Sequence, residues 1–129
     1  MASKDNVPYS EKRRAKRIFV PLGSTALFLN SFGSLEKIYV RDISVIGMLL
    51  CDYYSSAKKY SLDSTIYNIY VDIPPSESNA GSETRFLVDR GKIVRSSIDQ
   101  GSETLCYGIE LLYESSYVKD KIEWLVNKN

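Results

Sequence analysis

The feature that most constrains this chain is a succession of short segments rich in strand-forming residues, separated by short polar stretches. In several of them apolar and polar side chains alternate, which is the pattern of a β-strand with one buried face. Strands at such short intervals predict a mainly β fold, either an antiparallel barrel or a sandwich. The predicted strands cover residues 24–31, 34–44, 45–53, 64–73, 83–98 and 104–113.

Alternation also predicts which side chains face the core. In the segment 34–44 the residues expected to point inward are Ile38 and Val40, which are in phase with Asp42, whereas Lys37 and Arg41 alternate outward. In the segment 64–73 the expected buried residues are Tyr67, Ile69, Val71 and Ile73, with Ile66 on the opposite face. The segment 83–98 contains Asp89–Gly91, which fits either a hairpin turn or a bulge in one long strand.

The hydrophobic period changes from two to a helical value at the C-terminus. Val118, Ile122, Leu125 and Val126 recur at the spacing of one helix face, which predicts a helix over residues 115–127. A helix this short needs tertiary packing to persist, so its apolar stripe should bury against the strands.

The composition argues against most catalytic and metal chemistry. The 129 residues contain no histidine, which removes the usual general base and most zinc sites. The two cysteines, Cys51 and Cys106, form no CxxC pair. Because both lie in apolar segments, we expect two buried free thiols, with a disulfide left open. We therefore expect a binding module rather than an enzyme, with no metal and no cofactor.

The N-terminal residues are polar and carry no secretory h-region, and no stretch approaches the roughly 20 apolar residues of a membrane helix. We therefore expect a cytoplasmic protein without a membrane partner. At this length a single domain is expected.

Positive charge is concentrated at the front of the chain, in "SEKRRAKRIFV" (residues 10–20). Residues 1–22 hold six bases and two acids, a balance of +4, whereas the remainder holds eleven bases and fourteen acids, a balance of −3. We expect a flexible tail over residues 1–10 and a flexible basic arm over 11–22. A basic arm on a mildly acidic body indicates a local site for an anion.

Two short motifs accompany this charge pattern. Arg13 and Arg17 are spaced RxxxR, and "DISVIG" gives DxSxxG with Asp42, Ser44 and Gly47, beginning 25 residues after Arg17 (42 − 17). Each motif is weak alone. In this order, ahead of further strands and a terminal helix, they resemble the PilZ domain family of receptors for the bacterial second messenger cyclic di-GMP. "EKRRAKRIFVPL", "GKIVRS" and "YGIEL" are also similar to that family, so the resemblance covers residues 11–126.

The resemblance implies a six-stranded antiparallel PilZ-like β-barrel with a C-terminal α-helix, in one domain over residues 11–129. Within it we expect the arm at 11–22, the barrel at 23–113 and the helix at 115–127. It also implies a ligand site: Arg13 and Arg17 for phosphate and the Hoogsteen edge of guanine, Asp42 and Ser44 for the opposing guanine, and Gly47 for close approach. Arg14, Arg41 and Gly108 are candidate helpers.

The function implied is a receptor or adaptor that orders its N-terminal arm when cyclic di-GMP binds and signals through a protein partner. One alternative is a PilZ-fold protein-interaction module that does not bind nucleotide. Another is a small barrel that binds RNA or single-stranded DNA through the arm and the ten tyrosines. The net charge of only +1 argues against nucleic acid as the partner.

Overall fold

The structure is a computed structural model that describes residues 15–30, 33–53, 60–75, 83–99, 101 and 104–128. Its elements within these residues are the strands β1 (Ile18–Phe19), β2 (Thr25–Leu29), β3 (Leu35–Ile43), β4 (Gly47–Asp52), β5 (Thr65–Ile73), β6 (Thr84–Asp99) and β7 (Thr104–Leu112), followed by the helix α2 (Ser116–Lys128). This is the mainly β architecture with a terminal helix that the alternation and the change of period predict.

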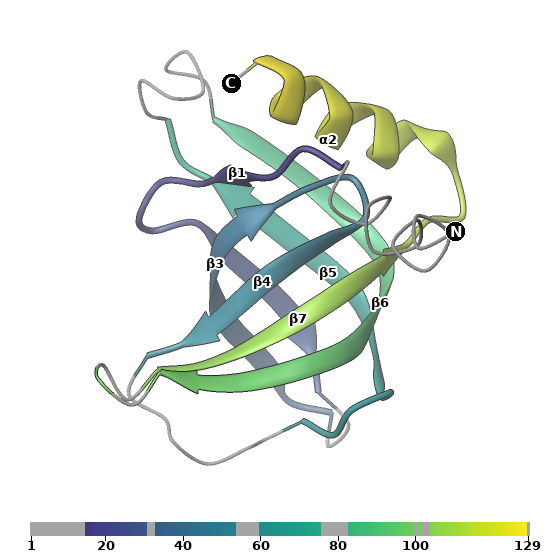
Figure 1. Ribbon diagram of the computed structural model, residues 1–129. Helices are drawn as coiled ribbons and strands as arrows, with labels where there is room; N and C mark the ends of the chain where they lie inside the picture. The colour runs from purple at the N-terminus through teal and green to yellow at the C-terminus, as the bar shows by residue number, and fades with distance from the viewer. Residues whose placement is uncertain are drawn as a thin grey trace, which may run out of the picture.

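Six strands close into an antiparallel barrel, as Figure 1 shows. The hydrogen-bonded order is β3-β2-β5-β6-β7-β4, and the pairing of β3 with β4 closes the ring. The short strand β1 also pairs with β3, at Asp42 and Ile43, which already pair with β4 on the other edge. β1 and β2 therefore pair with the same edge of β3. β2 pairs with Leu35–Tyr39, and β1 pairs further along, with Asp42 and Ile43. The six-stranded barrel is confirmed, with β1 as an additional strand.

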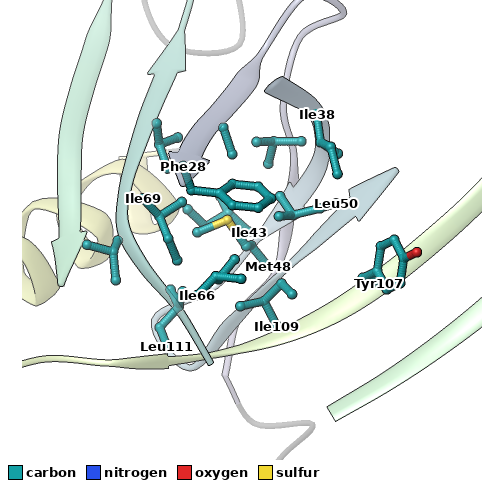
Figure 2. Packing of buried hydrophobic residues seen from close by; sticks show 14 of the residues in the cluster. Phe28, Ile38, Ile43, Met48, Leu50, Ile66, Ile69, Tyr107, Ile109 and Leu111 are labelled. Atoms are coloured by element: carbon teal, nitrogen blue, oxygen red, sulfur yellow. The ribbon is translucent and has the colours of Figure 1, made fainter. Parts of the chain in front are cut away.

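The barrel interior holds the hydrophobic core. Phe28, Ile43, Leu50 and Ile69 are each at most 2% exposed, and Figure 2 shows their side chains converging between the strands. The helix α2 crosses one end of the barrel (Figure 1). Its buried residues are Ile122, Leu125 and Val126, with Val118 packed partly against the same cluster. Each such burial contributes about 1.5–3 kcal/mol, so the core holds the helix in place.

The face assignment in β5 is correct for its second half and wrong at its start. Ile69, Val71 and Ile73 are buried, but Tyr67 is 54% exposed and Ile66 is only 5% exposed. The cause is an irregularity against β2, where Leu27 and Leu29 pair with Tyr70 and Tyr67. The extra residue in β5 accompanies a left-handed backbone at Asn68, with φ of 53°. Such a bulge reverses the alternation on one side of it.

β6 runs without interruption from Thr84 to Asp99, so the hairpin alternative at Asp89–Gly91 is wrong. Gly91 serves packing instead. A Cβ at Gly91 would lie 2.6 Å from Ile109 Cγ2 and 2.8 Å from Ile69 Cδ1, so a side chain there would displace the core. No helix among the described residues is long and apolar enough to span a bilayer.

The expectation of two free thiols is wrong. Cys51 on β4 and Cys106 on β7 lie directly opposite each other, with Cα atoms 4.1 Å apart, and they form a disulfide. Both are buried, as their apolar surroundings predict. The strand register is what brings them together, because the two residues are 55 positions apart in the sequence.

Candidate ligand-binding site

The two sequence motifs meet where β1 pairs with the end of β3. Phe19 lies opposite Asp42 in this pairing, and Arg17 immediately precedes the strand. Arg17 Nε lies 3.6 Å from Asp42 Oδ1, an ion pair between a side chain that is 55% exposed and one that is 7% exposed. The structure thus brings together one residue from each motif. Arg13 and Arg14 lie outside the described residues.

A bulge in β3 aims Asp42 at this site. Val40 pairs with Leu50 and Asp42 with Leu49, so β3 contains one extra residue, Arg41, relative to β4. Residues directly opposite each other share a face. Val40 therefore faces the core with Leu50, whereas Asp42 shares the outer face with Leu49. The phase expected for Asp42 from simple alternation is wrong because the bulge shifts it.

Burial raises the pKa of the Asp42 carboxyl above its ordinary value, and the positive charges of Arg17, Arg95 and Arg41 act in the opposite direction. The carboxylate is therefore desolvated within a positive field. Its two oxygens offer a strong, directed acceptor to a ligand that presents paired N–H donors.

Ser44 holds the turn between β3 and β4. Its hydroxyl oxygen accepts hydrogen bonds from the backbone N–H of Ile46 at 3.3 Å and of Gly47 at 3.2 Å. The same hydroxyl donates to the carbonyl of Gly47 at 3.3 Å, and the backbone N–H of Ser44 donates to that carbonyl at 2.8 Å. Ser44 is 4% exposed. Its first role in the structure is to fix the shape of the turn, and a contact with a ligand stays a prediction.

Gly47 has a packing requirement of its own. A Cβ built at Gly47 would lie 2.6 Å from the backbone oxygen of Ile109, and a backbone atom cannot move aside cheaply. The glycine therefore allows the turn to sit tightly against β7. This requirement is independent of any close approach by a ligand, which stays a prediction.

A groove of about 560 Å³ on the outer surface of the barrel contains the described motif residues. Its lining comprises Arg17, Asp42, Ser44, Ile46, Gly47, Met48, Leu49, Val94, Arg95, Gly108, Ile109 and Glu110. The candidate helper Gly108 thus joins the motif residues, but Arg41 does not. Arg41 lines a separate hollow of about 570 Å³ with Phe19, Tyr39 and Tyr53.

The sequence reasoning missed one cationic residue of the groove, Arg95 on β6. Arg95 lies in the segment "GKIVRS", which carried part of the family resemblance, but alternation alone gives no reason to single it out. In the described part of the chain, no group of three or more metal-ligating side chains gathers anywhere. The chemistry that the groove offers is therefore that of guanidinium groups, carboxylates and backbone.

Comparison with known proteins supports the fold. No protein-family model and no curated protein matches the sequence. Among solved structures, the PilZ domain of YcgR from Escherichia coli with c-di-GMP superposes with a TM-score of 0.65 at 19% identity, covering 90% of this chain and 89% of that one. The K. pneumonia MrkH–c-di-GMP complex gives 0.71 at 15% identity, covering 89% of this chain and 51% of that one.

Bacillus subtilis MotI/DgrA, named as an inhibitor of motility, gives a TM-score of 0.68 at 10% identity, covering 90% of this chain and 50% of that one. The chain thus spans about half the length of MrkH and MotI/DgrA, and 45% of the longer YcgR structure. The fold is PilZ-like. At these identities the likeness concerns the fold, and the site residues rest on the geometry of this chain.

Proposed function

We propose that this chain is a receptor for cyclic di-GMP. The observation that carries the proposal is the groove in which Arg17, Asp42, Ser44 and Gly47 gather from two separate parts of the sequence. The structures of YcgR and MrkH, which have this fold, contain c-di-GMP, which adds support.

The ligand's chemistry fits the groups in the groove. Cyclic di-GMP carries two phosphodiester anions and two guanines. The guanidinium of Arg17 can fork onto phosphate oxygens or onto guanine O6 and N7. Asp42 can accept from guanine N1–H and N2–H₂, a pair of donors that a phosphate does not offer. Arg17 and Asp42, 3.6 Å apart, thus offer a cation for the phosphate and a desolvated acceptor for the guanine.

Less of the arm can become ordered on ligand binding than the sequence predicts, because the end of the arm is already part of the sheet. Ile18 and Phe19 already pair with β3, and the N–H of Val20 donates to the carbonyl of Arg41 at 3.1 Å. In our proposal the ligand draws Arg17 from Asp42 toward a phosphate, and Arg13 completes the clamp. The shifted arm then alters the binding of a protein partner in the cytoplasm, and the protein catalyses no reaction.

The test is isothermal titration calorimetry of the protein with cyclic di-GMP, with GTP and a single-stranded RNA as comparison ligands. We expect saturable binding of the cyclic dinucleotide and little binding of the other two. A folded protein that gives no heat at high micromolar cyclic di-GMP contradicts the proposal and favours a protein-interaction module without nucleotide. Tight RNA binding that weakens steeply with salt instead favours a nucleic-acid-binding barrel.

A further inference from the structure

A bulge in β6 brings Arg95 to the same groove as Asp42. Ile93 on β6 pairs with Ile109, but Arg95 pairs with Gly108, so Val94 is an extra residue in β6. Ile93 is buried, and the two residues after it are both exposed. Strict alternation would return Arg95 to the barrel interior. The bulge instead turns this charged side chain to the outer face, and bulges often re-aim side chains in this way beside functional sites.

Gly108 leaves the space that the Arg95 side chain occupies. A Cβ built at Gly108 would lie 2.7 Å from Arg95 Cγ, 2.8 Å from its Nε and 3.2 Å from its Cδ. The stem of Arg95 therefore passes directly over the glycine, which is buried beneath it. Any larger residue at position 108 has to push the arginine aside, and because Cγ moves only by rotation about χ1, the whole side chain would be displaced with it.

The charge of Arg95 is available to a ligand. Within the part of the chain that the structure describes, no carboxylate lies within ion-pair distance of its guanidinium. Glu110 also lines the groove. Burial has the larger effect on the pKa of the Asp42 carboxyl and raises it, whereas the positive charge of Arg95 lowers it. Arg17 and Arg95 lie on opposite flanks of the groove. Arg17 precedes β1 and Arg95 is on β6, and the strands β3, β4 and β7 lie between β1 and β6 in the sheet.

We propose that Arg95 is a ligand-binding residue that contacts one phosphodiester of the cyclic dinucleotide while Arg17 contacts the other, and that Gly108 positions it. This inference rests on the proposed function of the groove. Two cations on opposite flanks of the groove suit a ligand with two separated anions better than a mononucleotide, which carries all of its phosphate charge at one end. Gly108 acts through Arg95 rather than by touching the ligand.

The first experiment is calorimetry of cyclic di-GMP binding to Arg95→Gln and Arg95→Lys. Loss of a charge-assisted contact should weaken binding on the order of 10- to 100-fold in Arg95→Gln. Arg95→Lys should retain much more affinity, because a compact cation still neutralises a phosphate. Arg85→Gln is the matched control: it removes the same charge from the same strand, outside the groove, and should leave the affinity within about twofold.

The second experiment is a double-mutant cycle between Arg95→Ala and Gly108→Ala. Gly108→Ala should weaken binding in the wild-type background, because the new methyl group displaces Arg95. It should have little effect once Arg95 is alanine, since the obstructed side chain is gone. Equal losses in both backgrounds would show that position 108 acts independently of Arg95, which contradicts the positioning role.

The outcomes separate this inference from the proposed function. If the folded wild-type protein does not bind cyclic di-GMP, both fail together. If the wild type binds and Asp42→Ala loses affinity while Arg95→Gln does not, the proposed function stands and the role of Arg95 is refuted. If Arg95→Gln and Arg85→Gln weaken binding equally, the effect is one of general charge, and the specific contact is also refuted.

Discussion

The hydroxyl of Tyr113 donates a hydrogen bond to the backbone carbonyl of Val45 at 2.7 Å. Val45 lies inside the turn between Ser44 and Gly47, and Tyr113 lies between the end of β7 and the start of α2. The next residue of the turn, Ile46, accepts from the N–H of Leu111 at 3.0 Å. The turn that shapes the candidate site is therefore fastened to the segment that leads into the C-terminal helix.

Removing this hydroxyl should loosen the turn. Tyr113→Phe keeps the ring, whose surroundings are partly buried, and leaves the carbonyl of Val45 without that donor. We expect the free energy of unfolding to fall by about 1 kcal/mol in urea denaturation. The affinity for cyclic di-GMP should fall with it. Unchanged stability and affinity would show that the turn holds its shape without Tyr113.

Arg17 should matter for binding much more than for folding. Its ion pair with Asp42 spans 3.6 Å and its guanidinium is half-exposed, so we expect a contribution to stability on the order of 1 kcal/mol. Calorimetry should show that Arg17→Ala lowers cyclic di-GMP affinity on the order of tenfold or more, while urea denaturation shows little change. Arg17→Lys should not restore the affinity, because lysine can neutralise a phosphate but lacks the forked donors that Arg17 can also place on guanine O6 and N7. Full rescue by lysine would refute bidentate recognition.

Asp42 should link ligand binding to pH. The ionised carboxylate accepts the guanine donors, and burial raises its pKa, so affinity should fall as the pH is lowered through that raised value. Calorimetry across a pH series measures this fall. Asp42→Asn should bind weakly at every pH and lose this dependence, whereas a variant that keeps the wild-type profile would assign the titration to another group.

The same group should oppose stability at neutral pH. Because its folded pKa lies above its unfolded value, the favourable contribution is present at low pH and is lost as the pH rises through the folded pKa. Asp42→Asn should therefore unfold at higher urea than the wild type at pH 7, and this advantage should shrink in acid. A destabilised variant at pH 7 would show that the ion pair with Arg17 outweighs the cost of burial.

The Cys51–Cys106 disulfide predicts that the intact protein has no free thiol. Labelling under denaturing, non-reducing conditions should modify neither cysteine, and both should react after reduction. The double variant Cys51→Ala, Cys106→Ala should lose about 2–5 kcal/mol of stability, because the link closes a loop of 55 residues. Labelling of both cysteines without reductant would contradict the disulfide.

The sequence predicts the parts of this fold that follow from regular periods. The apolar spacing of Ile122 and Leu125 is enough to identify the helix and its buried face, and alternation is enough for Ile38 and Val40. Both motifs of the site were readable because their residue types and order are distinctive. In the structure Arg17 and Asp42 lie 3.6 Å apart and both line the groove, and their contact with a ligand stays a prediction.

What the sequence does not predict depends on irregular backbone and on register between distant strands. The bulges at Arg41 and Val94 turn Asp42 and Arg95 outward, and the bulge in β5 exposes Tyr67. A bulge adds one residue without any distinctive composition, so alternation assigns the following side chains to the wrong face. The sequence does not predict the disulfide for a similar reason. Only the register of β4 against β7 places Cys51 opposite Cys106.

The most direct test of the central claim is an NMR titration of the protein with cyclic di-GMP, read from assigned backbone amides. We predict saturable shifts at Arg17, at Asp42–Gly47 and around Arg95, the residues that surround the groove. Amides beside Tyr53, in the separate hollow, should shift much less. Saturable shifts confined to that hollow, or no shifts at high micromolar ligand, would contradict a cyclic di-GMP site in this groove.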